Sequence, residues 1–189
     1  MSEPFSTRLA SGKEAERAIA NFLRDQGHSV LFAAEVPVNA FRGPQLYYPG
    51  GSVSLPDLLV FPKAQSSFFA EVKLRENASW HRSTGNWQTG IENRYLEDYL
   101  KVAEYTSLQI FLYFVQVKSK PSSADERYGC PAECPTGIFK AEAKALAESI
   151  SHRWQHGFTQ PRVYWNLADL EQVAPLEAIS QFNVIDSTY

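Results

Sequence analysis

The sequence has little of several features that define whole classes of protein. It contains two cysteines and one methionine in 189 residues, which argues against a disulfide framework. No run of about 18 apolar residues occurs, and this excludes a transmembrane helix. The first residues lack the apolar stretch of a secretory signal. We therefore expect a cytoplasmic protein that does not bind a membrane.

Basic residues are also not in excess. Lys and Arg number 18 against 21 Asp and Glu, a net charge of −3, which excludes a non-specific polycation but leaves room for a local basic groove. The chain is 44% hydrophobic and 21% charged, as globular proteins are. We expect one domain over 1–189, with a core at about 11–117, an accessory loop and helix at about 118–156, and a terminal strand and helix at about 157–189.

The apolar patterns predict alternating helices and strands. Ser11 and Glu14 have the spacing of a capping box and Gly27 suits a helix C-terminus, which predicts a helix over 12–26. Further helices are predicted at 91–106, 138–154 and 167–173, strands at 29–38, 57–61, 67–74, 108–117 and 162–165, a short strand at 46–48, and otherwise loop over 39–56, 75–90 and 118–137. This order indicates an α/β domain with a mixed central sheet flanked by helices.

Three ionisable residues stand in or beside predicted strands. Asp57 begins one strand, and Glu71 and Lys73 point to the same side of the next because strand side chains alternate. Charged groups persist in a buried sheet only when they are paired or bind a metal. Two converging carboxylates form an oxygen site suited to Mg²⁺, and a neighbouring lysine can stabilise charge at a phosphoryl centre.

Pro56-Asp57, thirteen intervening residues and Glu71-Val72-Lys73 resemble the core motif of the PD-(D/E)XK nuclease superfamily. The helix GKEAERAIANFLRDQG, which contains Glu16, resembles the opening of Holliday-junction-resolvase-like and RecB-like nuclease domains. The resemblance implies a restriction-endonuclease-like αβββαβ core and a Mg²⁺-dependent DNA endonuclease that also accepts Mn²⁺. It also implies DNA as the partner and a homodimer.

The resemblance further implies roles for individual residues. Asp57 and Glu71 would hold the metal, together with the main-chain carbonyl of Val72. Lys73 would position or activate water, and Glu16 would assist through a water or a second metal. Two alternatives remain open: Glu71 and Lys73 as an ordinary exposed strand pair, and a catalytically silent nucleic-acid-binding or scaffolding protein on the same fold.

Cations near aromatic rings after the second of these strands are candidates for nucleic-acid contact. The segment RENASWHRSTGNWQTG combines two tryptophans with basic side chains, which can bind phosphates and stack on bases. The candidate contact residues are Arg75, His81, Arg82, Gln88 and Arg94. The other interpretation of this segment is a surface loop whose tryptophans pack back onto the core.

The cysteines and two histidines follow the order of a Cys₂His₂ zinc site. Cys130 and Cys134 precede His152 and His156, with seventeen residues between the pairs. The two histidines would share one face of the predicted 138–154 helix and its extension. Unligated thiols and surface histidines explain the same pattern, so the sequence leaves a structural zinc ion open.

Overall fold

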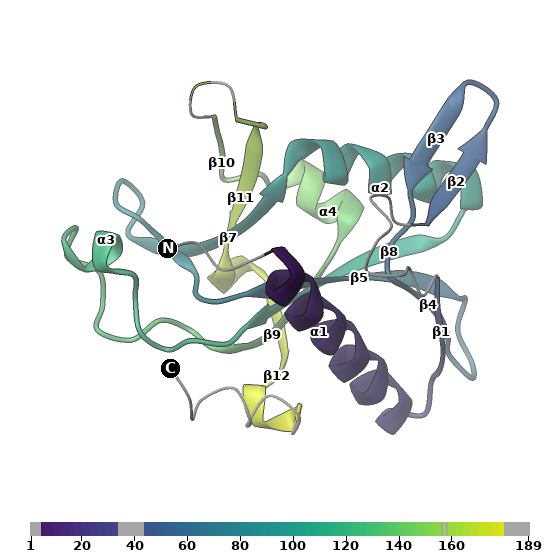
Figure 1. The fold of residues 1–189 in the computed structure, drawn as a ribbon, viewed down its shortest axis with the longest axis horizontal. Helices are drawn as coiled ribbons and strands as arrows, with labels where there is room; N and C mark the ends of the chain where they lie inside the picture. Colours follow the sequence, from purple (N-terminus) through teal and green to yellow (C-terminus); the bar gives the residue numbers. More distant parts are fainter. Residues whose placement is uncertain (1–4, 34–43, 156, 158, 180–189) are drawn as a thin grey trace.

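A computed structural model describes residues 5–33, 44–155, 157 and 159–179, and it is built on a six-stranded mixed sheet (Figure 1). The strand order is β1 (Ser29–Phe32), β4 (Leu58–Phe61), β5 (Phe68–Arg75), β8 (Gln109–Gln116), β9 (Gly137–Glu142) and β12 (Glu171–Ala174). Only β5 and β8 run parallel; the other neighbours are antiparallel. The predicted α/β fold class, with a mixed central sheet flanked by helices, is confirmed.

Helices cover both faces of this sheet (Figure 1). Helix α1 (Phe5–Asp25) packs Ala15, Ala18 and Ile19 against one face of the sheet. On this face β5 contributes Ala70 and Val72. Helices α2 (Asn93–Thr106) and α4 (Ala143–Glu148) belong to the hydrophobic cluster on the other face. Alternation along β5 therefore places Glu71 and Lys73 on the α2 side.

The two ends of α1 differ in how well the sequence predicts them. The predicted capping box at Ser11 is wrong, because the helix already begins at Phe5 and continues through Ser11. The predicted end is confirmed. Gly27 adopts a φ of 85°, its N–H donates to the Arg24 carbonyl, and the N–H of His28 donates to the Leu23 carbonyl. Glycine suits this left-handed position because it has no Cβ to clash.

A second, four-stranded antiparallel sheet stands on the α2 side. Its order is β10 (His152–Trp154), β11 (Arg162–Asn166), β7 (Asn86–Glu92) and β6 (Ser79–His81). The prediction of a loop over 75–90 is therefore wrong, because most of this segment forms the β6–β7 hairpin. Within the hairpin, Trp80 pairs with Trp87 across the two strands. Paired aromatic side chains stabilise strands even where the sequence between them is polar.

The helix predicted over 138–154 is also wrong. The first part is β9, which pairs with β8, the middle is the short α4, and the end is β10. Strand pairing on the central sheet here overrides the helix propensity of an alanine-rich segment.

Smaller differences occur at the remaining elements. A hairpin of β2 (Gln45–Tyr48) and β3 (Gly51–Ser54) extends the single short strand predicted there. The helix predicted over 167–173 is instead the 3₁₀ turn η1 (Leu167–Asp169) followed by β12. Two short elements complete the fold: α3 (Ser123–Glu126), between β8 and β9, and η2 (Leu176–Ala178), after β12. Part of the predicted 29–38 strand lies outside the described residues.

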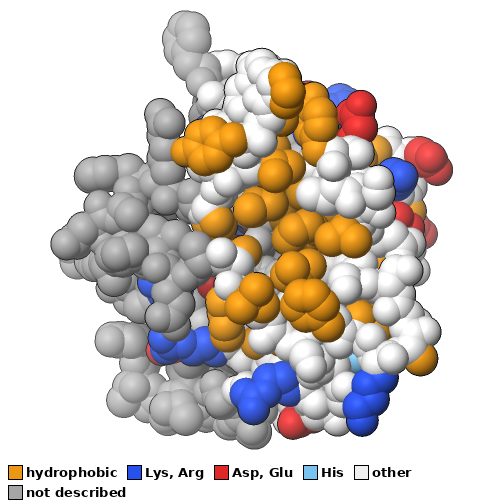
Figure 2. All heavy atoms as spheres, turned by 90° about the vertical axis from the view of Figure 1, so that its right-hand side faces the viewer, with side chains coloured by type: hydrophobic (Ala, Val, Ile, Leu, Met, Phe, Trp, Pro, Cys, Tyr) orange, Lys and Arg blue, Asp and Glu red, His pale blue; other side chains and the backbone are white. Residues whose placement is uncertain are grey.

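Hydrophobic side chains gather on the side that carries β1 and the β2–β3 hairpin (Figure 2). Large exposed apolar residues include Leu31, Tyr47, Phe61 and Tyr105. No helix in the described part of the chain combines the length and apolar character needed to cross a membrane.

Candidate active site

Asp57 lies where the pairing between β4 and β5 stops. The register of these strands ends at Leu58 opposite Ala70, so β5 continues past the beginning of β4. The Asp57 carboxylate accepts a hydrogen bond of 2.8 Å from the main-chain N–H of Val72 in that continuation. A side chain thus satisfies a backbone donor that the β4 backbone does not reach.

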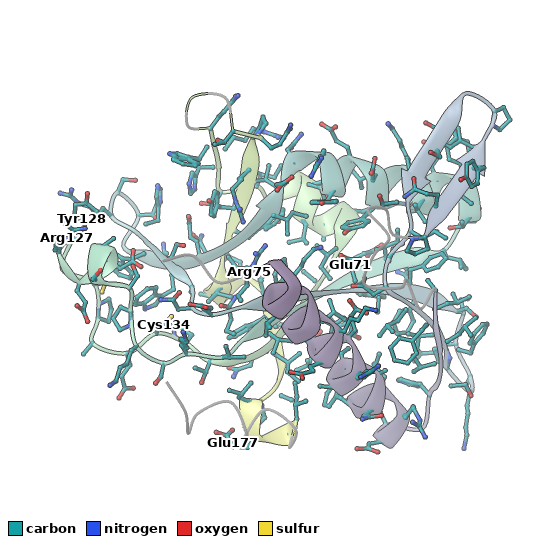
Figure 3. All side chains as sticks on the ribbon, in the orientation of Figure 1. Glu71, Arg75, Arg127, Tyr128, Cys134 and Glu177 are labelled. Carbon is teal, nitrogen blue, oxygen red and sulfur yellow. The ribbon has the colours of Figure 1, made fainter. Side chains whose placement is uncertain are left out.

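Glu71 and Lys73 form an ion pair on the α2 side of β5, where Figure 3 labels Glu71. The Glu71 side chain is 5% exposed and that of Lys73 is 22% exposed. Burial acts to lower the pKa of Lys73, but the Glu71 and Asp57 carboxylates outweigh it, so this pKa is raised. Lys73 is therefore a charged ammonium held beside two carboxylates.

This arrangement makes the charged form of Asp57 unfavourable. Burial, and after it repulsion from Glu71, raise its pKa well above the ordinary value, against the favourable effects of Lys73 and of the Val72 N–H. Two acids that repel each other in a poorly solvated place are typical of sites built to bind a cation or to move a proton.

Two tyrosines on α2 complete the surroundings of Lys73 and Glu71. The Lys73 Nζ lies 5.0 Å from the centre of the Tyr95 ring, within range of a cation–π interaction. Tyr99, one turn further along, is 2% exposed. Burial, followed by the charges of Glu71 and Asp57, raises the pKa of Tyr99 well above its ordinary value, so its hydroxyl stays protonated. Tyr99 is not among the candidate residues predicted from the sequence, because in the predicted 91–106 helix it lies among apolar side chains.

Glu16 approaches the same group from α1. Burial raises its pKa, repulsion from Glu71 raises it further, and Lys13, Lys73 and Arg17 oppose the shift. Its neighbours Ala15 and Ile19 pack against the sheet, so Glu16 lies beside the buried stripe of the helix.

The donors present fit a cation that keeps several waters. No three Asp, Glu, His or Cys side chains within the described residues are grouped so that they could hold a metal ion, so a metal here would rely on two carboxylates. The N–H and C=O of a strand residue point to the same neighbour, so the Val72 carbonyl also faces the side that β4 leaves open. Mg²⁺ is usually bound by one or two carboxylates with waters and substrate phosphates, which this donor set matches.

The five candidate nucleic-acid contacts divide into two groups. Arg75 and Gln88 face inward: the Arg75 guanidinium donates to the Gly90 carbonyl, and Gln88, 1% exposed, donates to Ser151 and Asn166. Burial and the neighbouring Arg162 lower the pKa of Arg75 to about 10. The other three lie nearer the surface: His81 is half-buried, Arg82 is exposed, and the exposed Arg94 pairs with Glu92 at 2.8 Å.

The arrangement behind the zinc hypothesis is not found. His152 lies in β10 and not on a helix, so the shared helical face is wrong, and His156 lies outside the described residues. The Cys134 thiol is 3% exposed and accepts a hydrogen bond of 3.2 Å from the Ala78 N–H. Cys130 and Cys134 join no metal-binding group with other described residues.

No protein-family model matches this sequence, and neither does any curated protein. Among solved structures, the chain is similar to Archaeoglobus fulgidus Hjc, a Holliday junction resolvase from an archaeal hyperthermophile. The two are 11% identical, the match covers 89% of this chain and 99% of that one, and the TM-score is 0.48. A likeness at this level carries no conclusion about activity.

Proposed function

We propose that this protein is a Mg²⁺-dependent DNA endonuclease that hydrolyses a phosphodiester bond. The observation that carries the proposal is the convergence of Asp57, Glu71 and Lys73 where β5 extends beyond β4. A structural role alone gives no reason to place two mutually repelling carboxylates beside a half-buried lysine, because each charge costs desolvation energy.

Asp57, Glu71 and the Val72 carbonyl would hold the cation. When bound, Mg²⁺ supplies Lewis-acid stabilisation of the phosphate and lowers the pKa of water. Lys73 contributes a fixed positive charge that orients the attacking water and stabilises negative charge on the phosphoryl oxygens. The Tyr95 ring lies against that ammonium. Glu16 would assist through a water.

The test is cleavage of a supercoiled plasmid and of a branched oligonucleotide, with Mg²⁺ or Mn²⁺ titrated into chelator-treated protein. We expect cleavage that requires the metal and is lost in Glu71→Gln. Mn²⁺ binding, followed by electron paramagnetic resonance, should weaken in the same variant. DNA binding without metal-dependent cleavage would instead identify a silent nucleic-acid-binding protein on this fold. The predicted homodimer is measured by light scattering of the same preparation.

A further inference from the structure

Three stacked rings connect three strands of the small sheet. His81 in β6 stacks on His152 in β10 with ring centres 4.2 Å apart and planes 8° apart. His152 in turn stacks on Tyr164 in β11 at 4.7 Å and 5°. Near-parallel rings from three strands form a rigid column, because each ring limits the tilt of the next.

Gly90 in β7 lets this stack lie close to the sheet. A Cβ at Gly90 would stand 2.7 Å from the Tyr164 ring and 2.4 Å from the Val163 carbonyl oxygen. Tyr164 in β11 pairs directly with Gly90 in β7. Only glycine at this position leaves room for the Tyr164 ring, because it has no side chain.

A pocket of about 190 Å³ opens beside the stack. Its wall includes Trp80, His81, Gln88, His152, Trp154 and Tyr164. A cavity of about 150 Å³ accepts one six-membered aromatic ring, so this pocket has room for a planar heterocycle. Trp154, one of the lining residues, is 47% exposed.

The central ring of the stack, His152, is uncharged in the folded protein. The Nδ1 atom of His152 is buried and has no hydrogen-bond partner among the described residues. Burial, followed by the neighbouring His81, lowers the pKa of His152 and favours its neutral ring. An uncharged ring can remain in the stack without the cost of burying a charge.

Two arginines lie between β5, which carries Glu71 and Lys73, and the four-stranded sheet, which carries the pocket. Arg75 lies on the same side of β5 as Lys73 and further along the strand than Glu71 (Figure 3). Arg75 and Arg162 both donate to the Gly90 carbonyl, and the Arg162 guanidinium lies 5.9 Å from the centre of the Tyr164 ring. On the far side, Arg82 borders a second, open pocket that shares Trp80 and His81 with the first.

We propose that this pocket binds an unpaired base of the DNA substrate against the rings of Trp80 and Trp154, beside the stack of His81, His152 and Tyr164, while Arg82 and Arg162 attract the flanking phosphates. Aromatic rings that accept bases beside cations that attract the backbone are the features by which proteins bind single-stranded nucleic acid. The inference rests on the proposed nuclease function and names its substrate class as DNA with unpaired nucleotides beside the cleaved bond.

The experiment compares two labelled oligonucleotides of equal length and charge in metal-free buffer, followed by fluorescence anisotropy. One is oligo(dT), and the other carries abasic sites in place of bases. We expect oligo(dT) to bind at least about tenfold tighter, because each stacked base contributes about 1–3 kcal/mol. Trp154→Ala and His152→Ala should each reduce this preference about tenfold. Tyr47→Ala, which removes a 79% exposed ring on β2, should leave it unchanged.

Thermal denaturation identifies any variant that fails to fold. A further variant changes Arg82, which is exposed. Arg82→Ala should weaken both oligonucleotides by the same factor, because it removes phosphate attraction and no stacking ring. Equal affinity for both oligonucleotides in the unsubstituted protein overturns the pocket, even where metal-dependent duplex cleavage is observed. A base preference that depends on Trp154 in a protein without cleavage supports the pocket and overturns the nuclease.

Discussion

The Asp57 carboxylate accepts a hydrogen bond of 2.8 Å from the Val72 main-chain N–H. This contact continues the β4–β5 ladder with a side chain one step beyond the last paired residues, Leu58 and Ala70. It also holds the carboxylate close enough to Glu71 for repulsion to raise the pKa of Asp57. The same contact therefore supports the fold and concentrates negative charge at the candidate metal site.

Asp57→Asn should raise the melting temperature of the metal-free protein by a few degrees. The amide oxygen keeps the bond to Val72, while the buried charge and its repulsion from Glu71 disappear. Asp57→Ala should be less stable than Asp57→Asn, because an unsatisfied N–H costs about 1–3 kcal/mol. Calorimetry in EDTA measures both, with exposed Glu133→Gln as the matched control. A lower melting temperature for Asp57→Asn would contradict the repulsion argument.

Lys73→Ala should reduce DNA cleavage by at least about a hundredfold, a typical cost of losing one pre-organised charge. DNA affinity in EDTA should change less than about threefold, because many cations share phosphate binding. Initial cleavage rates and anisotropy on the same DNA separate the two effects. Full activity in this variant would reduce Lys73 to a structural partner of Glu71.

The buried ion pair predicts a non-additive pair of variants. Lys73→Met alone should lower the free energy of unfolding by about 3 kcal/mol, because it leaves the Glu71 charge buried without its partner. Adding Glu71→Gln removes that charge and should restore most of the loss. Urea denaturation of the two single variants and the double variant measures the coupling. Additive losses would show that the pair contributes little.

The lowered pKa of His152 predicts a fall in stability on acidification. The unfolded chain takes up this proton near pH 6.5, whereas the folded protein does so only at lower pH. The unfolded state therefore binds more protons between these values, and the free energy of unfolding falls as the pH drops through this range. His152→Phe keeps an aromatic ring against Tyr164 and should show a weaker pH dependence. Melting temperatures from pH 7.5 to 5 test this, and parallel curves would contradict it.

Gly90→Ala should destabilise the protein and disturb Tyr164, because the new methyl group meets backbone and ring atoms at 2.4 and 2.7 Å. Gly12→Ala is the matched control: it lies in α1 with open space around its Cβ position. There, alanine should stabilise the helix by up to about 1 kcal/mol. Thermal unfolding should show a lower melting temperature for Gly90→Ala and a higher one for Gly12→Ala. Equal shifts in the two variants would contradict the close approach at Gly90.

The sequence by itself determined the order of the core elements and the side on which its charges lie. The period of two in FFAEVKLR places Glu71 and Lys73 together, and apolar runs mark β4, β5 and β8 as strands. The glycine after α1 fixes its end, because only that residue type enters the left-handed turn without strain. These are local properties, so they can be recognised along the chain.

Only the tertiary structure decided which segments pair over long distances. Residues 75–90 have the composition of a loop, and residues 138–154 that of a helix. Both nevertheless supply strands, because pairing with β8 and β11 satisfies their backbone groups. The stack of His81, His152 and Tyr164 follows from that pairing, which joins residues more than seventy positions apart. No local pattern encodes such contacts, because their energy comes from side chains that meet only once the sheet has formed.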